Sequence, residues 1–301
     1  MKKFLICIVV SYLAIYQPYA AAALKVFACE PEWGALVREL AGDKADVYDA
    51  TTALQDPHAI QARPSLIARA RSSELVVCTG AELEVGWLPL LLRQSGNPAI
   101  QPGRPAYFEA AAFVHMLDVP TRLDRAAGDV HAAGNPHIQT DARNIALVAD
   151  ALAQRLAALD APNAAYYETR HGDFIGRWKS ALQRWEKQAQ PLKGTPVVWQ
   201  HQGFPYLRDW LGLKEITTLE PKPGVEPSSA YLSQVLARLQ RQPASMIIRA
   251  AYNDGRASQW LSERAHIPVV VLPFSVGAND KARDLFGLFD DTIERLLQAR
   301  K

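Results

Sequence analysis

The chain has 301 residues, of which 33 are Lys or Arg and 31 are Asp or Glu, and 49% are hydrophobic. This composition is close to the globular average, which excludes a disordered, collagenous or coiled-coil chain, and the length suits two ordinary domains or one large domain. A formal net charge of +2 provides no basic field for nucleic acid, so no nucleic-acid partner is expected and function must be read from local motifs.

The first 23 residues have the features of a secretory signal peptide. Lys2 and Lys3 form a charged start, an apolar run follows as far as Ile15, and four alanines close the segment at 20–23. A membrane anchor is the alternative, but the apolar run is short for a bilayer span and has no stop-transfer flank. Cys7 lacks the Leu-Ala/Ser-Gly/Ala setting of a lipoprotein site. We therefore expect a cleavable signal peptide at residues 1–23 and an exported mature chain.

The first half of the mature chain alternates short apolar runs with amphipathic stretches. The pattern predicts strands at residues 24–28, 46–48 and 75–78 and helices at residues 32–41, 64–72 and 87–93. Strands that alternate with helices in this way imply βαβ units and a parallel sheet.

Residues 141–188 have a different pattern, almost free of strand signals. Their apolar residues recur at helical spacing, and Pro162 interrupts the series. The simplest interpretation is two packed helices. A long helical stretch between two α/β halves also indicates a rigid connection between them.

The second half of the chain repeats the alternation of the first. It predicts strands at residues 196–199, 215–219, 246–248 and 268–272 and helices at residues 206–211, 228–239, 257–265 and 285–297. The expected fold class is α/β, with two lobes that each hold a parallel-type sheet flanked by helices. We assign an N-terminal lobe to residues 24–140, a connecting helical segment to 141–190 and a C-terminal lobe to 191–301. The cleft between two such lobes is where an α/β protein binds its ligand.

Three of the seven histidines occupy loops that the predicted strands bring to one edge. His58 ends a Gln-Asp-Pro-His turn, His137 ends Gly-Asn-Pro-His, and His201 follows the strand at 196–199. Any one of them, taken alone, is most simply a core or loop histidine. Together, imidazoles at the carboxyl ends of parallel strands predict a metal site, and three imidazoles suit Zn²⁺ better than Mg²⁺ or Ca²⁺.

These motifs resemble those of the periplasmic metal-binding proteins of zinc and manganese ABC transporters. The resemblance rests on residues 56–58 (Asp-Pro-His), 80–87 (Gly-Ala-Glu-Leu-Glu-Val-Gly-Trp), 135–138 (Asn-Pro-His-Ile) and 198–204 (Val-Trp-Gln-His-Gln-Gly-Phe). It covers the mature chain in order. It implies two α/β lobes joined by a long helix, with the metal in the cleft between the lobes.

The same resemblance leaves the fourth metal ligand open. The family has an Asp after its last strand, whereas residues 272–277 here read Leu-Pro-Phe-Ser-Val-Gly. Glu30, Glu220 and Asp280 are candidate replacements, and water is another. The family's His-rich loop is also missing; His131 is close enough along the chain to reach the metal, although a solvated loop histidine is the simpler interpretation, and we favour water or an acid over a further histidine.

The two cysteines of the mature chain each end a predicted strand. Cys29 and Cys78 could pair in an oxidising compartment. The family's strand order would make their strands neighbours, and adjacent parallel strands offer poor disulfide geometry, so two buried thiols are favoured over a bond. Thiolate ligation of the metal is expected even less.

The leading functional hypothesis is a periplasmic, monomeric binding protein that captures Zn²⁺, in preference to Mn²⁺, and delivers it to an inner-membrane ABC permease. A metal-dependent adhesin or metal buffer of the same fold is the alternative. A zinc hydrolase is a third hypothesis, because three histidines and an open position also describe catalytic zinc. The sequence contains neither a His-Glu-x-x-His helix nor a Gly-x-Ser-x-Gly elbow, so we do not expect an enzyme.

Overall fold

The computed structural model describes residues 22–122, 128 and 131–300. Apart from its last two residues, the predicted signal peptide therefore lies outside the described part of the chain. No helix in that part is both long and apolar enough to span a bilayer.

The N-terminal lobe is built on a parallel sheet with the strand order β2-β1-β3-β4. Its elements are β1 (Leu24–Ala28), α1 (Pro31–Ala41), β2 (Ala45–Asp49), α2 (Pro64–Arg71), β3 (Leu75–Cys78), α3 (Leu88–Ser95) and β4 (Tyr107–Glu109). All four residues of β3 are buried, as expected for a continuous apolar run in a sheet covered on both faces. The sequence pattern did not predict β4, which has three residues and only one buried side chain, Phe108.

The C-terminal lobe has a second parallel sheet, with the order β6-β5-β7-β8. Its elements are β5 (Pro196–Trp199), α6 (Pro205–Leu211), β6 (Lys214–Thr218), α7 (Ser229–Arg241), β7 (Met246–Ala250), α8 (Arg256–Ala265), β8 (Val269–Leu272) and α9 (Leu285–Ala299). The two sheets have equivalent strand orders, so the predicted α/β architecture of two similar lobes is confirmed.

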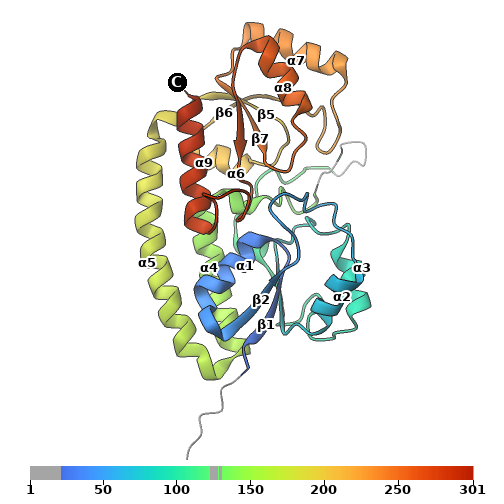
Figure 1. Ribbon diagram of the computed structural model, residues 1–301, viewed down its shortest axis with the longest axis vertical. Coiled ribbons are helices and arrows are strands. Elements are labelled where there is room, and N and C mark those ends of the chain that lie inside the picture. The colour runs from blue at the N-terminus through green and yellow to red at the C-terminus, as the bar shows by residue number, and fades with distance from the viewer. Residues whose placement is uncertain (1–21, 123–127, 129–130, 301) are drawn as a thin grey trace, which may run out of the picture.

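Two helices, α4 (Ala142–Leu159) and α5 (Ala164–Ala189), connect the lobes. They are separated by a short turn that contains Pro162, where the sequence pattern predicts the interruption. At 26 residues, α5 is about 39 Å long, and it runs along one side of both lobes (Figure 1). It packs against α1 of the N-terminal lobe and α9 of the C-terminal lobe.

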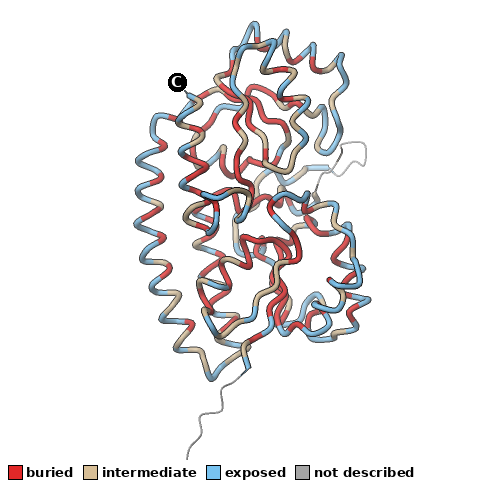
Figure 2. Tube along the Cα trace, in the orientation of Figure 1, coloured by how far each residue is buried: buried red, intermediate tan, exposed pale blue. Residues whose placement is uncertain are grey.

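A single apolar core runs through both lobes. Side chains of β1 and α1 belong to the same buried cluster as those of β5, β7 and α9, with α4 and α5 between them. Figure 2 shows the buried trace continuing from one lobe into the other. Trp178 of α5 is central to it: the ring is fully buried, packs on Phe286 and Phe289, and donates Nε1–H to the carbonyl of Ala142. Separate apolar clusters fill the outer faces of the sheets, under α2 and α3 in one lobe and α7 and α8 in the other.

Cys29 and Cys78 form a disulfide, which corrects the expectation of two thiols. Cys78 ends β3, and Cys29 follows β1, whose register pairs Ala28 with Val77. The two cysteines are thus directly opposite each other, and their Cα atoms are 4.8 Å apart, within the range that a disulfide spans. Cys29 lies one residue beyond the end of β1, where the chain turns into α1. The bond therefore links the two chain segments at the carboxyl end of the strand pair.

Candidate functional site

The three histidines singled out in the sequence lie together between the lobes. The ring centroid of His58 is 5.2 Å from that of His137 and 6.2 Å from that of His201, and the last two are 5.8 Å apart. Imidazoles bound to one tetrahedral Zn²⁺ through bonds of about 2.0–2.1 Å have ring centroids about 5 Å apart. The observed cluster is therefore within about 1 Å of a closed set of three metal-binding imidazoles.

His58 is fixed by an Asp two residues before it. Oδ1 of Asp56 accepts a hydrogen bond from the backbone N–H of His58 at 3.0 Å and lies 2.7 Å from its Nδ1. Burial alone would raise the pKa of Asp56, but the hydrogen bonds and charge of His58 lower it below its usual value. An ionised carboxylate only accepts, so Nδ1 carries the proton and Nε2 is the nitrogen left for a metal.

The motif at residues 80–87 packs against the loop that carries His58. Trp87 donates its indole N–H to the carbonyl of Pro57 at 2.9 Å. Gly86 lies against the carbonyl oxygen of His58, where a Cβ would come within 2.9 Å of that atom. Glu84 accepts hydrogen bonds from the backbone of Thr79 and Gly80 and so closes the turn. This motif thus positions the His58 loop through backbone contacts.

His137 is the most deeply buried of the three, with 1% of its surface exposed. Its backbone N–H is held by the side chain of Asn135, which also donates to the carbonyl of Gln202 in the other lobe. Burial, and then the charges of His58 and the neighbouring histidines, lower the pKa of His137 well below its usual value. Its Nδ1 is buried without a hydrogen-bond partner among the described residues. A neutral imidazole with an unpartnered, buried nitrogen fits a metal ligand.

His201 comes from the C-terminal lobe, two residues after β5. Its Nδ1 lies 2.7 Å from Oε2 of Glu220, which follows the neighbouring strand β6. The backbone N–H of Glu220 bonds the carbonyl of Gln200, and its carboxylate also accepts the N–H of Gly224. Glu220, a candidate fourth ligand from the sequence, is thus placed as the orienting partner of His201.

The other candidate acids lie elsewhere. The side chain of Asp280 is 97% exposed and pairs with Arg283. Glu30 is buried, but its partners are Thr79 and the nearby carboxyls of Glu84 and Glu32, not a histidine. Neither residue is brought into the histidine cluster.

His131 is brought to the cluster instead of being a solvated loop residue. Its ring stacks on that of His58 with centroids 5.5 Å apart, and its charge contributes to the lowered pKa of His137. Phe274, from the stretch where the family has its Asp, sets its ring against His137 at 5.2 Å. This side of the cluster is therefore an apolar wall and supplies no carboxylate.

Sequence reasoning missed the orienting role of Asp56 and Glu220 and the wall formed by Phe274. The Asp-Pro-His spacing was a usable signal for Asp56, because an Asp two residues before a loop residue commonly bonds its backbone. No comparable local signal links residues 201 and 220, which meet only because β5 and β6 are adjacent.

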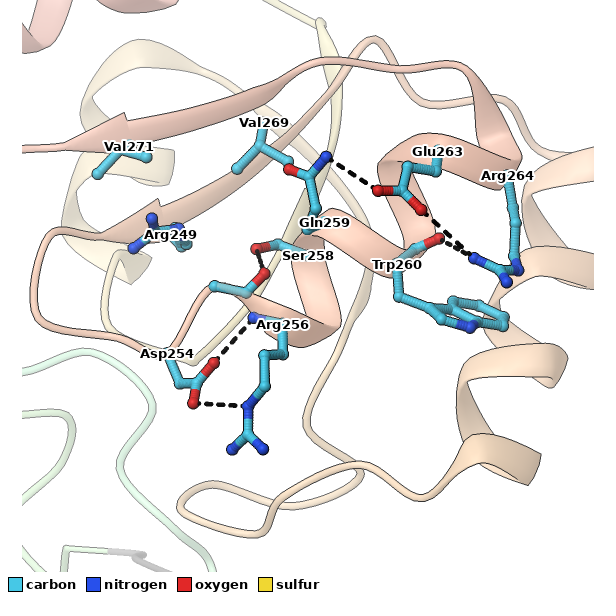
Figure 3. A pocket seen from close by; sticks show the side chains of 11 residues that line it. Arg249, Asp254, Arg256, Ser258, Gln259, Trp260, Glu263, Arg264, Val269 and Val271 are labelled. Atoms are coloured by element: carbon cyan, nitrogen blue, oxygen red, sulfur yellow. Dashed lines mark hydrogen bonds and ion pairs between the residues drawn. The ribbon is translucent and has the colours of Figure 1, made fainter.

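A surface pocket of about 760 Å³ lies on the C-terminal lobe between β7, α8 and β8 (Figure 3). Three arginines line it, of which Arg256 and Arg264 are already paired with Asp254 and Glu263. No histidine lines this pocket, so it is separate from the histidine cluster.

Several known proteins are similar to this chain over most of its length. The family model described as "Zinc-uptake complex component A periplasmic" matches residues 26–299. The high-affinity zinc uptake system protein ZnuA of Bacillus subtilis (strain 168) is 20% identical over 275 residues, covering 88% of this chain and 82% of that protein. The manganese ABC transporter substrate-binding lipoprotein PsaA of Streptococcus pneumoniae is 22% identical over 258 residues, covering 84% and 80%.

Solved structures share the fold. A crystal structure of ZnuA aligns with a TM-score of 0.77 at 19% identity, covering 93% of this chain and all of that one. The laminin-binding adhesin Lmb of Streptococcus agalactiae aligns with a TM-score of 0.76 at 18% identity, with the same coverage. The two-lobed fold with its connecting helices is common to all of them. The family model spans residues 26–299 of the 301, so this protein belongs to the zinc-uptake component A family, the substrate-binding proteins of metal ABC transporters.

Proposed function

We propose that this protein captures Zn²⁺ in the periplasm with His58, His137 and His201 and delivers it to the inner-membrane permease of an ABC importer. Substrate-binding proteins of such importers work with a membrane permease and an ATPase, and the family consists of transport components, not enzymes. The observation that carries the proposal is the convergence of three imidazoles from both lobes on one point.

The donor set favours zinc over manganese. The relatives named for each metal are 22% and 20% identical to this chain, too similar in distance for their names to decide between the two metals. The two carboxylates nearest the cluster, Asp56 and Glu220, are engaged with the Nδ1 atoms of histidines. This leaves nitrogen ligands for the metal, whereas Mn²⁺ prefers a larger share of oxygen. Carboxylate–histidine pairs of this kind also raise the basicity of the ligand nitrogen.

The fourth position is open to His131 or to water. His131 is the one further donor among the described residues whose ring lies against a cluster histidine. Residues 272–277 contain no Asp or Glu, and Phe274 lies against His137 in the stretch where the family has its Asp. In the titration described next, weaker Zn²⁺ binding by His131→Ala supports the imidazole, and unchanged binding assigns the position to water.

The test is a competition titration of metal-free protein with Zn²⁺ and Mn²⁺. We expect tighter binding of Zn²⁺, and losses of at least about tenfold for His58→Ala, His137→Ala and His201→Ala, because removal of second-shell partners alone typically costs 10–100-fold. His171→Ala is the matched control, since His171 pairs with Asp150 on the connecting helices. Tighter Mn²⁺ binding would overturn the zinc assignment. Equal losses in the control would mean that the wrong histidines have been chosen.

A further inference from the structure

A second group of potential metal donors lies at the disulfide in the N-terminal lobe. Cys29 and Cys78 are both fully buried, at the adjacent carboxyl ends of β1 and β3. The two sulfurs and a carboxylate oxygen of Glu84 all lie within 4.8 Å of one another. These donor atoms, from two neighbouring strand ends and a tight turn, are near enough for one cation to contact all three once the S–S bond is opened.

The carboxyls beside the disulfide have no cationic partner. Glu30 and Glu84 are 3% exposed, and neither forms an ion pair with a Lys or Arg of the described residues. As carboxylates both can only accept hydrogen bonds, and Oε1 of Glu30 is buried with no hydrogen-bond donor among the described residues. Burial raises the pKa of both groups, that of Glu84 to about 7, and the charge of Glu84 raises the pKa of Glu30 further. A buried site of this kind is stabilised by a proton or by a metal cation.

The disulfide prevents its sulfurs from acting as thiolate ligands. We propose that reduction of the Cys29–Cys78 bond opens a second, buried site for a thiophilic divalent cation, formed by two thiolates and Glu84. A dithiol or phosphine reductant supplies two electrons, the S–S bond breaks, and uptake of two protons gives two thiols. The cation then displaces both protons as it binds. Thiolate and carboxylate donors suit Zn²⁺ or Cd²⁺, and the fourth position is left for water.

This site shares no ligand residue with the histidine cluster, and its use depends on redox conditions. In the disulfide form a cation bound at the histidine cluster can be released to a partner without breaking a thiolate bond. In the reduced form a buried thiolate site would compete for the same cation. The disulfide therefore keeps cargo at the exchangeable site in an oxidising compartment.

The experiment uses the mature protein with His58, His137 and His201 all replaced by Ala, so that failure of the proposed function does not affect the outcome. After treatment with a phosphine reductant without oxygen, the protein is titrated with Cd²⁺ alone. Thiolate-to-metal charge-transfer absorption is recorded. We expect one Cd²⁺ per chain with this absorption in the reduced protein and none in the oxidised protein. In the same background, Glu84→Gln should weaken binding at least about tenfold while the absorption band is kept.

Glu109→Gln is the matched control, because Glu109 ends the neighbouring strand β4 and is exposed. Circular dichroism of each oxidised variant checks the fold, and a thiol reagent confirms two free thiols after reduction. Two free thiols without a charge-transfer band would overturn the proposal. Equal affinities of Glu84→Gln and its parent would remove Glu84 from the site and overturn it as well.

Discussion

His58 and His201, in the loops that follow strands, are each held by a nearby carboxylate. Asp56 fixes Nδ1 of His58 from two residues away, and Glu220 fixes Nδ1 of His201 from the adjacent strand end. With Nδ1 occupied, each ring is held in one tautomer and one orientation, so that Nε2 faces the cluster. At this scale the site is two carboxylate–histidine pairs around the buried ring of His137.

Removing the orienting carboxylate of His201 should weaken metal binding without removing a ligand. We expect Glu220→Ala to lower Zn²⁺ affinity by about 10–100-fold, and Glu220→Gln by less, because the amide oxygen still accepts the Nδ1–H bond without its charge. Isothermal titration against a competing chelator measures the change. Glu215→Ala on β6 is the control, since Glu215 pairs with Arg208 on the surface. Parent-like affinity of Glu220→Ala would exclude the orienting role.

The first turn of α1 provides a contact between the lobes. Glu32 lies in this turn, is 1% exposed and accepts a hydrogen bond from the hydroxyl of Ser275, which follows β8. Burial raises the pKa of Glu32 to about 7, although the bond from Ser275 opposes the rise. An acid with a raised pKa stabilises the fold when it is protonated. Its contribution is fully present below the ordinary value of 4.5 and is lost as the pH rises through about 7.

Glu32→Gln should remove this dependence on pH. Between pH 4.5 and 8, the free energy of unfolding of the metal-free parent should fall relative to the variant by on the order of 2–3 kcal/mol. Urea unfolding at several pH values measures the difference, and Glu168→Gln on the exposed face of α5 controls for the change of charge. A constant difference between the parent and Glu32→Gln across this range would show that the group does not titrate as expected.

The connecting helices unite the two lobes into one packed body. A single apolar core passes through both lobes, and α5 contacts helices of each. Polar contacts reinforce the junction, as between Asn135 and Gln202 and between the hydroxyl of Tyr206 and the carbonyl of Asn135. Hinge closure requires a few residues that absorb a large backbone change with little packing lost, and this junction is packed throughout.

Metal binding should therefore leave the relation between the lobes nearly unchanged. We expect small-angle scattering curves of the metal-free and Zn²⁺-loaded protein to superimpose, and hydrogen exchange to slow locally around His58, His137 and His201. A protein of the same size that closes on its ligand by a hinge provides the positive control. A marked decrease in the radius of gyration on adding Zn²⁺ would contradict the rigid connection.

Local pattern alone was sufficient for the element order and for the three histidines. Alternating apolar runs and amphipathic stretches specify strands and helices because the two periods, 2 and 3.6 residues, differ along the sequence itself. Each parallel sheet places the residues that follow its strands at one edge, and the cleft expected between the two lobes is why His58 and His201 were predicted to meet. Only β4, with three residues, was too short for such a pattern.

The tertiary structure decided which groups face one another across strands and lobes. The pairing of Glu220 with His201, the disulfide between Cys29 and Cys78, and the contact of Glu32 with the other lobe join residues 19, 49 and 243 positions apart. Such contacts depend on strand order, register and the docking of the lobes, which the periodicity of the sequence does not encode. The sequence determined which donor residues follow the strands. Packing determined that Glu220 orients the imidazole of His201 and that Glu30 lies buried beside Glu84.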